Sequence, residues 1–165
     1  MIVRDKIGVL ERLLKQYERY YTINRENPVE PFAAEAEFSI HGEEYFLLKS
    51  AKYAEMDSRE IAFYALVDKL DDEKLTELDE RAWEEGLSRV DVKQNHRNTD
   101  ISLFIVADEI DPLTAARIKK LRRYKSYRFG LWGWSGYRLV AYELNSGKKV
   151  SNYLGRSLEK LFANM

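Results

Sequence analysis

The sequence predicts an α+β fold, formed by one globular domain over residues 1–165 with a mixed, mainly antiparallel sheet covered by helices. Three observations support this prediction. Apolar residues recur at helical spacing in four segments, and short apolar or alternating runs typical of strands lie between them. Two of the connections between strands are long enough for a helix that crosses the sheet. The expected order of elements is αβββαβαββα.

The first part of the chain predicts a helix followed by a hairpin. Apolar residues spaced by three and four from Val3 to Tyr21 share one helical face. Residues 32–40 alternate between apolar and polar side chains, residues 41–42 (His-Gly) have turn chemistry, and residues 45–48 are apolar again. Residues 32–49 are therefore expected to form a β-hairpin.

The middle of the chain predicts alternating strands and helices. Residues 61–67 are apolar on both faces, as in a central strand. Asp71 and Asp72 suit the start of a helix over about residues 72–90. A polar loop over residues 93–100 then leads to a second buried strand at residues 103–106.

The last third of the chain begins with a strong helix signal. An aspartate followed by proline at residues 111–112 is typical of a helix start. Residues 127–144 form two apolar and aromatic segments around Ser135-Gly136, which predicts a hairpin with its turn at that dipeptide. Leucines at residues 154, 158 and 161 predict a final helix.

Composition restricts the function classes. The chain has no cysteine, so a disulfide framework, a thiolate nucleophile and a thiolate metal site are excluded. No stretch approaches the roughly 20 consecutive apolar residues of a membrane span, and the first residues do not form a signal-peptide core. We therefore expect a small cytoplasmic protein that does not bind membranes. No phosphate loop, nucleophile elbow or dinucleotide fingerprint occurs, so no cofactor and no metal are expected.

The formal net charge of −1 hides a strong asymmetry along the chain. Residues 55–91 contain 13 acids and 5 bases, whereas residues 112–165 contain 12 bases and 2 acids. Two readings are open. Either the two stretches lie on neighbouring surfaces and neutralise each other, or the basic stretch binds a partner.

The basic, aromatic segment is the main candidate for a binding surface. Helical spacing places four cations on one face of the helix that starts at Pro112, namely Arg117, Lys119, Lys120 and Arg123, and tryptophans follow them. The candidate binding residues are Arg117, Lys119, Lys120, Arg123, Trp132 and Trp134. Because arginine and aromatic residues are enriched in interfaces, we expect a binding or interaction protein that contacts an acidic protein or a second copy of itself. Nucleic-acid binding is the alternative, with phosphates on the cations and bases on the rings.

An enzyme is the remaining hypothesis. His96 and Asp100 in the polar loop, and Asp108 at the end of the following strand, form the densest polar cluster near a strand terminus, so they are the candidate acid/base or metal-binding residues. A solvated surface histidine and strand-ending aspartates are the structural alternative.

The order αβββαβ resembles the layout of restriction-endonuclease-like nucleases, which is a likeness of layout only. Such nucleases combine an acidic residue with Asp or Glu, any residue, and Lys, which hold a divalent cation and orient water. Residues 72–74 (Asp-Glu-Lys) and 91–93 (Asp-Val-Lys) match the second element. With 28 acids and 13 lysines, about two matches are expected by chance, and both lie at helix ends where the family uses a strand. The residues therefore favour binding over a metal-dependent hydrolase or nuclease-like activity.

Overall fold

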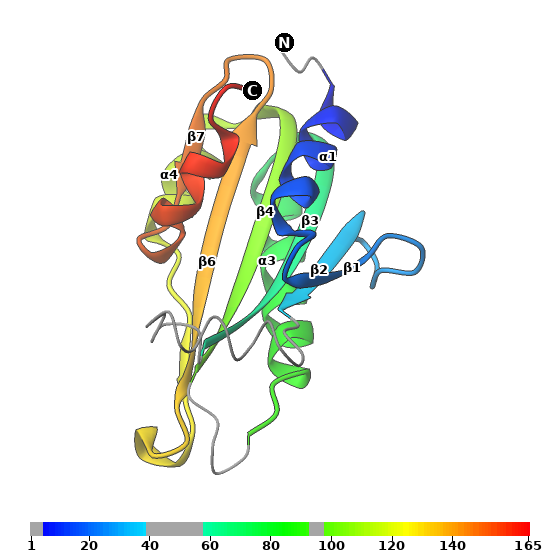
Figure 1. The fold of residues 1–165 in the computed structure, drawn as a ribbon. Helices are drawn as coiled ribbons and strands as arrows, with labels where there is room; N and C mark the ends of the chain where they lie inside the picture. Colours follow the sequence, from blue (N-terminus) through cyan, green and yellow to red (C-terminus); the bar gives the residue numbers. More distant parts are fainter. Residues whose placement is uncertain (1–4, 39–57, 93–97) are drawn as a thin grey trace.

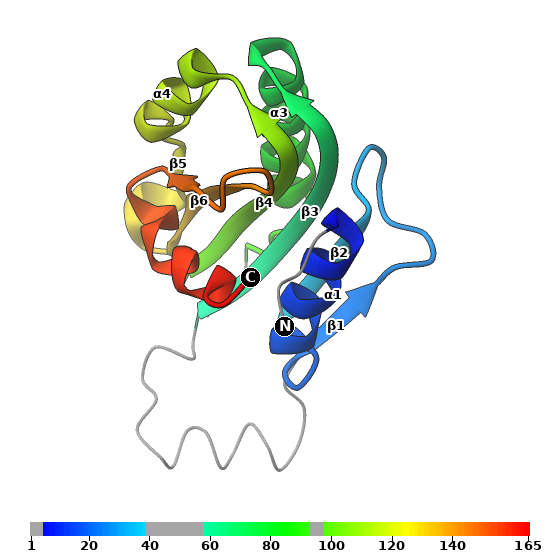
Figure 2. The ribbon, with the colours of Figure 1, turned by 90° about the horizontal axis from the view of Figure 1, so that it is seen from above.

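A computed structural model describes residues 5–38, 58–92 and 98–165. In these residues, seven strands form one mixed sheet in the order β1-β2-β3-β4-β6-β5, and β7 pairs with the later part of β6. Helices lie on both faces of the sheet (Figures 1 and 2). The strands are β1 (Tyr21–Asn24), β2 (Ala34–Phe38), β3 (Ser58–Leu70), β4 (Asn98–Ile110), β5 (Tyr124–Ser126), β6 (Trp134–Glu143) and β7 (Lys149–Ser151). The helices are α1 (Lys6–Tyr17), α3 (Asp72–Ser88) and α4 (Pro112–Lys120), with 3₁₀ helices η2 (Arg128–Gly130) and η3 (Leu154–Phe162). The predicted α+β class is confirmed.

The centre of the sheet consists of three parallel strands. β4 pairs in parallel with β3 on one side and with β6 on the other, while the other four pairings among the described strands are antiparallel. Parallel neighbours need a crossover connection, and α3 and α4 supply the two that the sequence predicts. The register sets Phe63 opposite Leu103 and Leu103 opposite Leu139, so the buried side chains of the three strands form rows.

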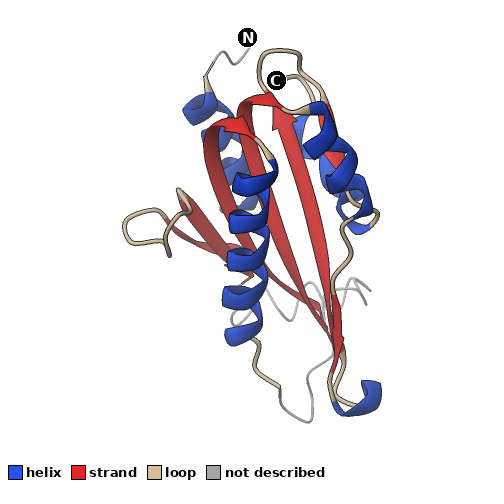
Figure 3. Ribbon diagram, turned by 180° about the vertical axis from the view of Figure 1, so that it is seen from behind, coloured by secondary structure: helices blue, strands red, loops and turns tan. Residues whose placement is uncertain are grey.

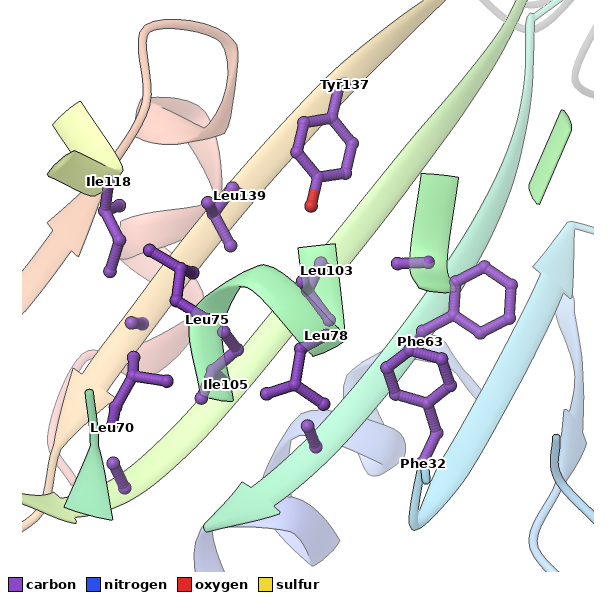
Figure 4. Close-up of a cluster of buried hydrophobic side chains, with 14 of the residues drawn as sticks. Phe32, Phe63, Leu70, Leu75, Leu78, Leu103, Ile105, Ile118, Tyr137 and Leu139 are labelled. Carbon is purple, nitrogen blue, oxygen red and sulfur yellow. The ribbon is translucent and has the colours of Figure 1, made fainter. Parts of the chain in front are cut away.

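Each face of the sheet carries its own hydrophobic core. On one face, α3 and α4 cover the sheet (Figure 3) and pack against a buried cluster that includes Leu75, Leu103 and Ile118. Figure 4 shows part of this cluster. On the other face, α1 and η3 cover a cluster that includes Leu13 and Phe162. No helix in the described ranges is both long enough and apolar enough to span a membrane.

The helix starts agree with the sequence signals. The side chain of Asp71 accepts a hydrogen bond from the Lys74 backbone N–H at 2.9 Å and caps α3. Asp111 caps α4 in the same way, with Pro112 at the first helical position.

The first strand is missing from the sequence prediction. α1 ends at Tyr17, and the segment predicted to complete the helix to residue 21 instead enters β1, which pairs with β2. The sequence over residues 20–23 is Tyr-Tyr-Thr-Ile, and aromatic and β-branched residues favour a strand where one is available to pair with. The apolar spacing at Tyr21 fits a helix, but pairing with β2 determines that this residue lies in a strand. The turn and second strand of the hairpin predicted at residues 32–49 lie outside the described residues.

The last third of the chain also differs from the prediction. The turn expected at Ser135-Gly136 lies earlier, at residues 127–133, because Gly130 and Gly133 there have positive φ angles, whereas Ser135 and Gly136 are buried inside β6. β7 was not expected, and the final helix is a 3₁₀ helix. β4 begins at Asn98, so the end of the expected polar loop belongs to a strand.

Close packing of α3 on β4 gives a test of the fold. A Cβ atom on Gly86 would lie 2.7 Å from Ile101 Cγ2 and Cδ1. We predict that Gly86→Ala lowers the free energy of unfolding by about 1–2 kcal/mol, because overpacking outweighs the better helix propensity of alanine. Chemical denaturation measures the change. Glu84→Ala, at an exposed position of the same helix, serves as control and stays within about 0.5 kcal/mol of the native chain. A Gly86→Ala chain as stable as the native one contradicts the close approach.

Candidate functional site

Two cations of the basic segment are paired with the acidic helix of the same chain. Arg123 donates from Nε to Asp79 Oδ1 at 3.0 Å and from Nη2 to Asp79 Oδ2 at 2.9 Å, and Asp79 is buried on α3. This hydrogen-bonded pairing holds the pKa of Arg123 above its ordinary value. Arg117 Nη1 donates to the backbone oxygen of Asp72 at 3.1 Å and lies 3.7 Å from its carboxylate. The acidic and basic stretches therefore neutralise each other at these two points.

The helical face expected to carry four cations is smaller than predicted. α4 ends at Lys120, where Leu121 takes an extended conformation, so Arg123 lies beyond the helix and points to α3. The prediction that Arg123 shares a helical face with the other cations was wrong, because it assumed that the helix continues beyond Lys120. Lys119 and Lys120 remain exposed on α4.

The two candidate tryptophans lie in a hairpin formed by β5 and β6. The turn between these strands is closed by backbone hydrogen bonds from Tyr127 N to Gly133 O (2.9 Å) and from Trp132 N to Tyr127 O (3.1 Å). The buried hydroxyl of Tyr127 also lies 2.9 Å from Ser135 Oγ, within hydrogen-bond distance. Because these contacts constrain both sides of the turn, the hairpin presents its end residues on a defined backbone.

The end of this hairpin, residues 128–132, is called the hairpin tip below. It exposes two large apolar side chains, with relative exposures of 103% for Phe129 and 82% for Leu131. The guanidinium of Arg128 lies over the Trp132 ring, 4.3 Å from its centroid, and Trp132 is half-buried. The tip projects past the neighbouring strands at the amino-terminal end of β6 (Figures 1 and 3). Trp134 lies outside the tip, as the first residue of β6.

The three candidate catalytic residues do not form one site. Asp100 and Asp108 lie eight residues apart on β4, which separates them by roughly 26 Å at about 3.3 Å per residue. Asp108 instead binds Lys6, with 2.6 Å between Oδ2 and Nζ. His96 lies outside the described residues. The prediction placed Asp100 in a loop close to Asp108. In the structure both residues belong to β4, with Asp100 near its start and Asp108 near its end.

A buried polar cluster near Asp100 escaped the sequence prediction. Glu60 on β3 accepts hydrogen bonds from Arg138 on β6, from Ser102 on β4, and from the Tyr21 hydroxyl at 2.7 Å. Arg138 Nε also donates to Ser102 Oγ at 3.1 Å. The available signal was a charged residue next to, or inside, an otherwise apolar strand sequence, as at Glu60 and Arg138.

Asp100 lies beside this cluster and directly opposite Glu60 in the parallel register. Burial raises the pKa of Asp100, the positive charge of Arg138 opposes that rise, and the negative charge of Glu60 adds to it. Within the described ranges, no hydrogen bond to the Asp100 carboxylate is present. Glu60 therefore has its charge compensated, and Asp100 has an acceptor that no described residue uses.

The described residues give the nuclease-like alternative no geometric support, and residue 93 of the second sequence match lies outside them. Residues 72–74 lie in the first turn of α3, not on a strand. Within residues 5–38, 58–92 and 98–165, no group of three or more His, Asp or Glu side chains is arranged to hold a metal ion.

The unfavourable burial of the Asp100 charge predicts a pH-dependent gain in stability on substitution. Asp100→Asn removes a charge that burial disfavours, so we expect unfolding at pH 7 to need about 0.5–2 kcal/mol more free energy. Because the pKa of Asp100 is raised in the folded chain, its penalty is complete above that raised pKa. The penalty shrinks as the pH falls, and it is absent below the ordinary value of 3.8. Urea denaturation between pH 3 and 8 measures this, and a destabilised Asn variant at pH 7 contradicts it.

Comparisons with known proteins place the chain in a family. No curated protein and no solved structure matches it. The model of one family, described as a domain of unknown function (DUF8052), matches residues 5–164. The chain therefore belongs to the DUF8052 family.

Proposed function

We propose that the chain is a protein-interaction module, and that its hairpin tip docks onto helix α3 of a second copy. The observation that carries the proposal is the exposure of Phe129 and Leu131 on a constrained turn. Covering large exposed apolar side chains with a partner surface removes apolar area from water, which favours binding. Since the backbone is already constrained, docking orders little of it.

The charges around the tip support an acidic partner surface. The chain has no acidic residue between positions 112 and 142, and Lys125 and Arg128 lie at or beside the tip. α3 offers a matching surface, because four glutamates recur along one face of the helix. These exposed residues are Glu73, Glu77, Glu80 and Glu84.

An apolar contact for the tip exists beside that glutamate face. Leu113, at the start of α4, is 77% exposed, and the first turn of α4 is joined to the first turn of α3 by a 3.0 Å hydrogen bond from Thr114 Oγ1 to Asp72 Oδ1. Phe129 of one copy could pack on Leu113 of another while Arg128 meets the glutamates. Tip and acceptor are different surfaces, so such contacts close into a symmetric pair or continue as a chain of copies.

Nucleic-acid binding is the second candidate, and it has less support. Arg117 and Arg123 already have acidic or carbonyl partners on α3, and one side of the Trp132 ring is covered by Arg128. Phosphate contacts would therefore depend on Lys119, Lys120 and the hairpin cations.

The proposed interaction module keeps the cytoplasmic location expected from the sequence.

Removal of the apolar tip tests the proposal. We predict that the native chain self-associates as its concentration rises to about 200 μM, which corresponds to a binding free energy of about −5 kcal/mol or stronger. The double change Phe129→Ser and Leu131→Ser leaves it monomeric. Sedimentation velocity measures both. Ile7→Ser is the matched control, because Ile7 is 64% exposed but lies on α1, on the other face of the sheet from α3.

A charge exchange tests the acceptor surface. Lys125→Glu with Arg128→Glu, and separately Glu77→Lys with Glu80→Lys, should each abolish self-association through like-charge repulsion. Mixing the two variants should restore a complex that weakens as salt rises. A native chain that stays monomeric contradicts the proposal. Saturable binding of an oligonucleotide at low salt, lost on Lys119→Glu with Lys120→Glu, would transfer the conclusion to nucleic acid.

A further inference from the structure

The sheet face that carries Asp100 also carries two exposed aromatic rings around a glycine. Tyr124 pairs with Gly136 across β5 and β6, and the register of β4 with β6 places Asp100 on the other side of Gly136. Trp134 precedes Gly136 by two residues and therefore lies on the same face. At about 4.8 Å between strands and about 7 Å between alternate residues, the three side chains start roughly 8–10 Å apart around the glycine.

Gly136 keeps this part of the face free of a side chain of its own. A Cβ atom there would lie 3.1 Å from Leu154 Cδ1 and 3.4 Å from Asp100 Oδ1. The carboxylate of Asp100 therefore lies against the glycine, with Leu154 as an apolar rim. Tyr124 and Trp134 are 65% and 44% exposed as residues, so the Asp100 acceptor and two accessible aromatic residues flank the glycine.

The charges of the cluster favour a cation over an anion. Glu60 and Asp100 carry two negative charges, and Arg138 supplies one positive charge that is already committed to Glu60 and Ser102. An incoming cation would neutralise the remaining negative charge and fill the unused acceptor of Asp100.

We propose that Asp100, Trp134 and Tyr124 form a binding site for a small organic cation that carries an ammonium or guanidinium group. The N–H groups of the cation donate to the Asp100 carboxylate, and its charge and carbon atoms pack on the two rings, as cations do over aromatic faces. The site uses residues outside the hairpin tip, so it does not depend on the proposed self-association. Burial raises the pKa of Asp100 and Arg138 opposes this rise only in part, which agrees with a carboxylate that a cation would stabilise in its charged form.

The test uses n-butylammonium and agmatine as cations, with n-butanol as the neutral counterpart and glucose as a polyol. Titration calorimetry and tryptophan fluorescence follow binding to the full chain. We expect saturable binding of the cations but not of butanol or glucose. Asp100→Asn should weaken cation binding at least about tenfold, through loss of a charge-assisted hydrogen bond, and Trp134→Leu should weaken it severalfold.

Controls separate the site from general effects of charge and folding. Glu84→Gln removes an exposed acid on α3 and should leave the affinity unchanged. Asp100→Asn is expected to fold at least as stably as the native chain, so its loss of binding would report on the site. Phe129→Ser with Leu131→Ser should bind the cations as the native chain does. Absent cation binding, equal binding of butanol, tighter binding of glucose, or an unaffected Asp100→Asn variant would each overturn the proposal.

Discussion

The ion pair between the half-buried Arg123 and the buried Asp79 connects the acidic helix to the basic segment, and the position of the hairpin depends on it. Asp79 lies in the interior on α3, where an ionised carboxylate without a partner is strongly unfavourable. Arg123 reaches it from the short connection between α4 and β5. The pair therefore fixes where the chain leaves α4 and how it enters the strand that carries the hairpin.

This pairing changes the meaning of the charge asymmetry in the sequence. Arg117 and Arg123 of the basic segment compensate acids of the same chain, so only part of the segment is available to bind a partner. Two smaller features remain exposed. One is the hairpin tip with its nearby cations, and the other is the area around Gly136 beside Asp100. The second arises from the parallel register, which aligns Glu60, Asp100 and Gly136 on neighbouring strands. Two neighbouring carboxylates face one half-buried arginine there, and Arg138 hydrogen-bonds only Glu60 of the two, so no described residue donates a hydrogen bond to Asp100.

Features with local signals were predictable from the sequence. The α4 start at Asp111-Pro112, the extent of α3 and the central strand near residue 63 depend on capping or on runs of apolar residues. Features set by distant pairing were not. β1 forms because β2 is beside it, and the turn of the β5–β6 hairpin lies where positive φ angles occur, not at Ser135-Gly136. The site at Asp100 depends on the register of three strands, and the partner of Arg123 lies 44 residues earlier in the chain.

A double-mutant cycle between Asp79 and Arg123 tests the central claim most directly. Unfolding free energies are measured for the native chain, Asp79→Asn, Arg123→Met and the double variant, at low and high salt. We predict that Arg123→Met alone destabilises the fold by about 3 kcal/mol, because it leaves the buried Asp79 carboxylate without its cation. The coupling energy should be at least about 1.5 kcal/mol and should change little with salt, because the Asp79 carboxylate is buried. Additive single effects, or a coupling that salt removes, would contradict the account.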